Sequence, residues 1–207
     1  MATNVYVDAF NLYYGCLKNT PYRWLNLAEL CRLMLPKDTI NQIKYFTAKV
    51  SARPNDPSQP VRQQTYLRAL QTIPNLSIIY GQFKTGPVWM PLANPQSGKS
   101  PYVEVLRTTE KGSDVNLASN LLIDGIRNDY DVAIVISNDS DLLEPIKFVI
   151  SDMGKKVGLL NPQKHASTDL ARHATFIKSI RKGVLAASQF PQTLTDRNGS
   201  FHKPSTW

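Results

Sequence analysis

The hydrophobic positions of the chain fall into short continuous runs separated by stretches with helical spacing. Val132–Ile136 is a run of five apolar, mostly β-branched residues bounded by polar ones. This pattern predicts a strand that is buried on both faces, as in a parallel sheet. Further strands are expected at Asn4–Val7, Lys44–Val50, Leu76–Phe83, Pro101–Thr109 and Lys156–Leu160.

Helical patterns lie between most of these predicted strands. Asn26 is placed to cap a helix that ends at Met34 and carries its apolar residues on one face. Further helices are expected at Val61–Leu70, from a capping Ser113 to Arg127, at Leu142–Met153 and from Ser167. Strands that alternate with helices predict an α/β fold with a doubly wound, mostly parallel sheet flanked by helices.

Two segments lack either pattern. Lys84–Ser100 contains several prolines and glycines around Trp89, which predicts a long surface loop or a hairpin. Beyond Ala187 the composition turns polar. We therefore expect one domain over residues 1–187 and a polar tail over residues 188–207.

Composition narrows the class of protein. The 207 residues suffice for one sizeable core, and 42% hydrophobic with 19% charged residues is typical of a folded chain. No apolar run approaches the roughly 20 residues that span a bilayer, and no secretory signal is visible. Cys16 and Cys31 show no metal-binding spacing and are too few for a disulfide scaffold. A reduced, cytoplasmic protein without a membrane partner is expected.

The net charge of +8 is unevenly distributed. Residues 1–150 contain 15 basic and 13 acidic side chains, whereas residues 151–207 contain 9 and 3. A basic half favours a polyanionic partner, most often a nucleic acid. A solvated surface that serves solubility is the alternative.

Acidic residues recur where predicted strands end or helices begin. Asp8 follows the first strand, with Asn11 three residues later; Asp139 and Asp141 follow the buried strand at 132–136; Asp114 opens a helix. If the first strand and the buried strand are neighbours, these groups converge at one edge of the sheet. Taken singly, each acid has a structural explanation as a turn, helix-start or capping residue.

Such a cluster of oxygen ligands favours Mg²⁺ or Mn²⁺ over softer metals. A carboxylate-bound metal on a basic protein suggests hydrolysis of a phosphodiester. Basic and aromatic residues on and around the proline-rich segment and near the last helix are candidates for nucleic-acid binding. A small satellite core explains the first group equally well, whereas the excess of positive charge near the last helix favours phosphate contacts over a merely solvated helix. These candidates are Lys84, Trp89, Lys99, Lys111, Lys178, Arg181 and Lys182.

Three blocks of sequence resemble the signature blocks of the NYN domain family: Val5–Leu12, Lys111–Ala118 and Val135–Leu142. The family comprises PIN-like, metal-dependent ribonucleases and includes the LabA-like bacterial group. The resemblance continues through a closing helix to about Ile180, and therefore covers most of the chain.

The resemblance implies a PIN-like sheet and an endoribonuclease that cuts single-stranded or structured RNA at an acidic Mg²⁺ or Mn²⁺ site. The residues it implies for this site are Asp8, Asp114, Asp139 and Asp141 as metal ligands, with Asn11 assisting.

Two positions depart from the family pattern. Asn120 stands where family members often have an acid, and Asn138 stands where they often have glycine. The first departure motivates an alternative, a non-catalytic RNA-binding or scaffold protein on the same fold. A nuclease directed at DNA would use the same site. A homo-oligomer is an open alternative to a monomer.

Overall fold

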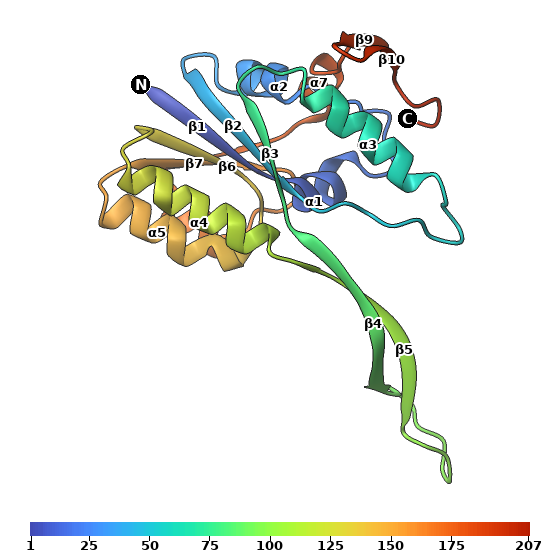
Figure 1. The fold of residues 1–207 in the computed structure, drawn as a ribbon. Helices are drawn as coiled ribbons and strands as arrows, with labels where there is room; N and C mark the ends of the chain where they lie inside the picture. The colour runs from blue at the N-terminus through green and yellow to red at the C-terminus, as the bar shows by residue number, and fades with distance from the viewer.

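A computed structural model of the protein describes residues 1–207. Its centre is a six-stranded sheet in the order β3-β2-β1-β6-β7-β8, in which every neighbouring pair is parallel (Figure 1). The predicted α/β fold with a parallel sheet is confirmed. The strands are β1 Ala2–Asp8, β2 Thr39–Thr47, β3 Leu76–Tyr80, β6 Val132–Ile136, β7 Lys156–Asn161 and β8 Phe176–Ser179.

The side on which new strands are added to the sheet changes at β1. The chain first builds outward through β2 and β3, and then returns to place β6 on the other side of β1. Val7 lies opposite Ile136 of β6, and Asp8 lies opposite Phe46 of β2. The carboxyl ends of β1 and β6 are therefore neighbours at a topological switch point, where open α/β sheets bind ligands.

Helices cover both faces of this sheet (Figure 1). α4 and α5 lie on one face, and α2, α3 and α7 lie on the other. None of the helices is long and apolar enough to cross a bilayer. Their bounds are α1 Ala9–Leu12, α2 Leu27–Met34, α3 Gln59–Leu70, α4 Ser113–Ile126, α5 Leu143–Ser151, α6 Thr168–His173 and α7 Lys182–Ala187, with a π-helix at Tyr13–Leu17 and a 3₁₀ turn at Ser140–Leu142.

Alternate residues of the central strands enter two separate cores. Val5 and Val7 pack under α2 and α3, whereas Tyr6 between them packs on the side of α4 and α5. The same alternation along β6 places Ile134 in the first core and Val135 in the second. The continuous apolar run of β6 thus follows from burial on both faces.

Local signals set most of the element boundaries. The Asn26 side chain accepts hydrogen bonds from two amides in the first turn of α2, as predicted. Ser113 begins α4 but does not cap it: the N-cap is Gly112, whose φ of 96° suits glycine. The helix expected from Ser167 is confirmed as α6, but it ends at His173 and does not continue to Ile180, because Phe176–Ser179 forms β8 at the edge of the sheet.

The proline-rich segment forms most of a hairpin, one of the two structures expected for it. β4 (Gln82–Pro91) and β5 (Tyr102–Lys111) pair as an antiparallel ribbon that projects far from the body of the molecule (Figure 1). Pro87 pairs with Leu106, and the next pair, Val88 with Val105, faces the opposite side. Both faces of the outer ribbon are therefore apolar, and the Leu106 side chain is 78% exposed.

The segment predicted to be a polar tail is folded. β9 (Thr193–Asp196) and β10 (Gly199–His202) form a hairpin, and Phe201 packs against the fully buried Trp24. Trp207 also contacts the Trp24 ring. A few widely spaced aromatic residues in a polar sequence have no periodicity, so the pattern did not reveal this packing.

We expect Phe201→Ala to lower the free energy of unfolding by about 3 kcal/mol. Phe201 is 7% exposed, and its ring contacts both Trp24 and the Arg68 guanidinium. Urea denaturation measures the change, with Phe148→Ala as a matched control because Phe148 is 45% exposed. Equal stability of the two variants would show that the C-terminal hairpin does not contribute to the core.

Candidate metal centre

Three of the predicted acids meet at the switch point. Asp8 ends β1, Asp139 follows β6, and Asp114 lies in the first turn of α4. One carboxylate oxygen from each lies within 4.8 Å of the other two. Asp8, which is more than 100 positions away from the other two in the sequence, thus joins them in one acidic cluster.

Asp8 is the buried member of the cluster. One of its oxygens accepts a hydrogen bond from the Asn11 amide at 2.9 Å, and the other accepts from the Ser137 hydroxyl at 2.9 Å. Burial raises the pKa of Asp8; these two hydrogen bonds oppose the rise, and the negative charge of Asp139 adds to it. A carboxylate in this position is held firmly but lacks a compensating positive charge.

Ser137 connects Asp8 to Asp139, a role that the sequence interpretation missed. Its hydroxyl donates to Asp8 and accepts from the Asp139 amide at 3.1 Å. Asp139 in turn caps the following 3₁₀ turn by accepting from the Asp141 amide. The sequence did contain a signal for this role: Ser137 is a small polar residue directly after a buried apolar strand. A polar side chain buried at such a position almost always makes a hydrogen bond.

The loop that carries Asp139 is fixed by two asparagines. The Asn11 side-chain oxygen accepts from the Asn138 amide at 3.0 Å, so Asn11 positions this loop. The Asn138 side chain bonds the Ser167 amide at 2.6 Å and the His165 carbonyl at 3.2 Å. The replacement of the usual glycine thus adds anchors between the loop and the segment before α6.

Asp114 is the most exposed member of the cluster, yet its pKa is raised. Burial raises the pKa of Asp114 to about 6, with further contributions from the negative charges of Asp8, Asp139, Glu110 and Asp141. Asp141 is itself exposed and does not belong to the group of three. Its predicted role as a ligand therefore stays a prediction.

The cluster fits a divalent cation. None of the five ion pairs in the structure involves Asp8, Asp114 or Asp139, so no lysine or arginine neutralises them. Carboxylates that repel one another and have no internal counter-charge gain most from an added cation. All three donors are oxygens, which suits Mg²⁺ or Mn²⁺.

The sequence profile of the NYN domain matches residues 2–180. The chain belongs to the NYN family. The resemblance based on the three sequence blocks is thereby confirmed. NYN domains are generally nuclease-like and related to RNA, and an acidic metal site is consistent with that class.

Two further comparisons identify proteins that are similar to this chain. It is 30% identical over 237 aligned residues to 6-hydroxy-3-succinoylpyridine 3-monooxygenase HspA of Pseudomonas putida (strain DSM 28022 / S16), an alignment that covers 100% of this chain and 75% of that protein. A crystal structure of a protein of unknown function from Vibrio parahaemolyticus RIMD 2210633 matches with a TM-score of 0.57 and 18% identity, over 87% of this chain and 93% of that one. The second comparison supports the PIN-like fold alone.

The predicted nucleic-acid-binding residues of the NYN domain lie in two separate places. Lys84, Trp89, Lys99 and Lys111 belong to the projecting ribbon or its tip, and all four are exposed. Lys178, Arg181 and Lys182 lie on β8 and at the start of α7.

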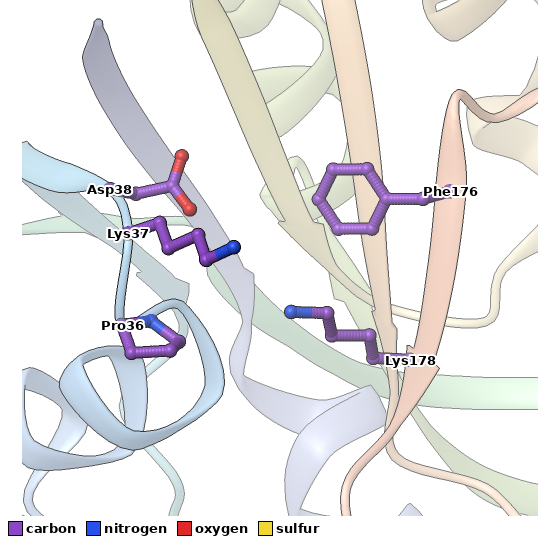
Figure 2. Close-up of a pocket in the computed structure, with 5 residues that line it drawn as sticks. All are labelled: Pro36, Lys37, Asp38, Phe176 and Lys178. Atoms are coloured by element: carbon purple, nitrogen blue, oxygen red, sulfur yellow. The ribbon is translucent and has the colours of Figure 1, made fainter.

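Lys178 is engaged within the protein. Its ammonium group donates to the Met34 carbonyl at 2.8 Å, in a cavity of about 330 Å³ beside the loop that leads into β2 (Figure 2). Figure 2 shows Lys37 and Lys178 pointing toward each other from opposite walls. This cavity lies at the amino end of β2, whereas Asp8 lies beside the carboxyl end. A role for Lys178 next to the acidic cluster therefore has no geometric support.

Asn120 does not face the acidic cluster. Its side-chain oxygen accepts from the Lys44 ammonium at 3.0 Å, and its amide group donates to the Asn116 carbonyl. Position 120 therefore belongs to the contact between α4 and β2. The missing acid leaves the group of three intact.

We expect Mn²⁺ binding to weaken about tenfold between about pH 7.5 and about pH 5, because a metal requires the ionised carboxylate and Asp114 has a pKa of about 6.

Without metal, we expect the stability of the protein to decrease, not increase, as the pH rises. The folded Asp114 holds a proton that the unfolded chain, with its ordinary pKa of 3.8, releases, so stability falls as pH rises from about 4 to 6.

Calorimetric titration with Mn²⁺ measures the first effect. Thermal unfolding in EDTA, compared with Asp114→Asn, isolates the second, since this variant should lose that part of the pH dependence. Metal affinity that is equal at both pH values would contradict the placement of Asp114 at the cation.

Proposed function

We propose that this protein is a metal-dependent endoribonuclease that hydrolyses phosphodiester bonds of RNA. The observation that carries the proposal is the convergence of Asp8, Asp114 and Asp139, from three separate elements, within 4.8 Å in a chain of the NYN family. The net charge of +8 supports a polyanionic substrate.

The four acidic residues have two kinds of role in this proposal. Asp8, Asp114 and Asp139 hold Mg²⁺ or Mn²⁺, and Asp141 adds negative charge at the exposed side of the site. When bound, the cation lowers the pKa of water and stabilises charge on the phosphodiester. Asn11 and Ser137 hold the two strand ends together: the Asn11 side chain accepts from the Asn138 amide, and the Ser137 hydroxyl donates to the Asp8 carboxylate and accepts from the Asp139 amide. The exposed position of Asp114 leaves the site open to a large substrate.

The decisive experiment is incubation of the purified protein with total RNA, with Mn²⁺, with Mg²⁺ and with excess EDTA. We expect cleavage with a divalent cation and none in EDTA, and sequencing of the new ends would define the preference for single-stranded or structured RNA. Cation-independent RNA binding without cleavage would support the alternative of a non-catalytic RNA-binding or scaffold protein.

A second candidate is the oxidation of a pyridine ring. It is favoured by the Pseudomonas relative, whose name states a 3-monooxygenase acting on 6-hydroxy-3-succinoylpyridine and which matches the whole of this chain. A monooxygenase places one oxygen atom of O₂ in its substrate and reduces the other to water, which requires a two-electron reductant. Mass spectrometry of that pyridine after incubation with ¹⁸O₂, the protein and a reductant would detect the product.

A further inference from the structure

A second cavity lies next to the chain segment that carries Asp8. It encloses about 320 Å³, and its walls come from α1 and the π-helix, the carboxyl end of β2, the loop after β2, α3 and the C-terminal Trp207. Ala9, which lines it, directly follows Asp8 in the chain. The cavity is therefore adjacent to the proposed metal site but is built from different side chains.

Aromatic rings form much of its lining. The six that face it are Phe10, Tyr13, Tyr14, Tyr45, Tyr66 and Trp207. Tyr13 and Tyr14 begin the π-helix, a rare geometry that is frequent at functional sites. Aromatic walls of this kind suit a flat ring, which stacks on them whatever its substituents.

The cavity also carries unneutralised positive charge. Four cationic residues and one acid line it, and the acid, Asp56, is paired with Arg62 at 2.5 Å. The Arg23 guanidinium bonds only backbone carbonyls, and the side chains of Lys18 and Arg53 have no carboxylate partner. Three cations without a carboxylate partner favour an anionic ligand.

One hydroxyl group that lines the cavity has no hydrogen-bond partner within the protein. Tyr45 is only 6% exposed, and its hydroxyl makes no hydrogen bond within the protein, whereas the hydroxyl of the neighbouring Tyr66 donates to the Leu25 carbonyl. Burial raises the pKa of Tyr45, and the charge of nearby Asp8 adds to the rise, so the hydroxyl keeps its proton. The Tyr45 hydroxyl is therefore free to donate a hydrogen bond to a ligand in the cavity.

We propose that this cavity binds one planar aromatic ring that carries an anionic group, with Tyr45 donating to the ring substituents and Arg53 pairing with the anion. The volume accommodates a single ring system. Two sources share this chemistry: a single nucleotide, free or at the end of an RNA chain, and a small aromatic carboxylate. The proposal does not rest on RNA cleavage, because it concerns binding alone.

The test is a binding titration of the full chain in EDTA, which separates the cavity from the metal site. Calorimetry with uridine 5′-monophosphate, adenosine 5′-monophosphate and nicotinate probes the two sources. Uridine, which lacks the anion, and cyclohexanecarboxylate, which lacks the aromatic ring, are the matched ligands. We expect at least one aromatic anion to bind with a Kd below about 1 mM and both matched ligands to bind at least about tenfold more weakly.

Variants locate the binding. Tyr45→Phe should weaken it about 3- to 10-fold through the lost hydrogen bond, and Arg53→Gln about tenfold. Tyr102→Phe and Arg172→Gln, at exposed positions away from the cavity, should have no effect. Unchanged melting temperatures would show that the variants are folded.

Each outcome has a defined meaning. Binding of nucleotides alone or of nicotinate alone identifies the source, and binding of both supports the shared chemistry. The proposal is overturned if no aromatic anion binds, or if Tyr45→Phe and Arg53→Gln both bind as tightly as the wild type. RNA cleavage by the same preparation, measured with Mn²⁺, would be unaffected by that failure.

Discussion

Asp8→Asn is expected to slow metal-dependent RNA cleavage at least about 100-fold. Cation stabilisation of a developing phosphodiester charge is worth several kcal/mol, and each 1.4 kcal/mol is a factor of ten in rate. The amide keeps the shape of Asp8 and an oxygen that accepts from the Asn11 amide, so α1 remains capped. It also removes one of three neighbouring negative charges, so the metal-free protein should be at least as stable as the wild type.

Single-turnover cleavage with Mn²⁺ measures the rate, and calorimetry with Mn²⁺ measures the loss of the cation. Asp152→Asn is the matched control, because Asp152 is an exposed acid at the end of α5 and has no part in the cluster. Cleavage by Asp8→Asn at the wild-type rate, or equal loss of rate in the control, would contradict the assignment of the site. A large fall in thermal stability would instead indicate that Asp8 acts through the fold.

The sheet was predictable because its central strand has a hydrophobic pattern that can be recognised in the sequence alone. The run Val132–Ile136 is apolar at every position, and burial on both faces allows only such a run. Once β1 and β6 are placed side by side, Asp8 and Asp139 come close together, since the strands run in the same direction, Asp8 ends β1, and Asp139 lies in the loop directly after β6. The acidic cluster therefore follows from local pattern and topology together.

The hydrogen-bond partners within the site were not predictable. Ser137 and Asn138 have the right chemistry for many roles, and only the approach of Asn11 and Ser167 in three dimensions selects one. The sequence interpretation consequently missed that the Asn11 side-chain oxygen accepts from the Asn138 amide, and its expected part in assisting the metal site stays a prediction. A hydrogen bond between two elements that are far apart in the sequence does not alter the hydrophobic periodicity of either element, so the sequence pattern cannot reveal it.

The C-terminal segment and the aromatic cavity were missed for a related reason. Trp207 packs against both Trp24 and Tyr66, and it also lines the cavity next to Asp8. Its two ring partners are far away in the sequence, so polar composition was the only visible property. Composition describes the average environment of a segment and says nothing about single aromatic anchors.

A buried ion pair joins α4 to β2 on the face opposite this cavity. The Lys44 ammonium lies 2.7 Å from an Asp124 oxygen, and the two side chains are 11% and 5% exposed. The Tyr6 hydroxyl donates to the same carboxylate at 2.7 Å, and Lys44 also donates to Asn120. The polar groups thus satisfy one another inside a largely apolar layer, which makes the removal of one partner costly.

We expect Lys44→Met to lower the free energy of unfolding by about 3–5 kcal/mol, because Asp124 is left buried without its cation. Adding Asp124→Asn should restore more than half of the loss, since the neutral amide still accepts from the Tyr6 hydroxyl. Lys147→Met, which removes the exposed pair with Glu144, should cost less than about 1 kcal/mol. Urea denaturation compares the three variants. If Lys44→Met costs no more than the control, or the second substitution restores nothing, the charge of Asp124 is not what Lys44 stabilises.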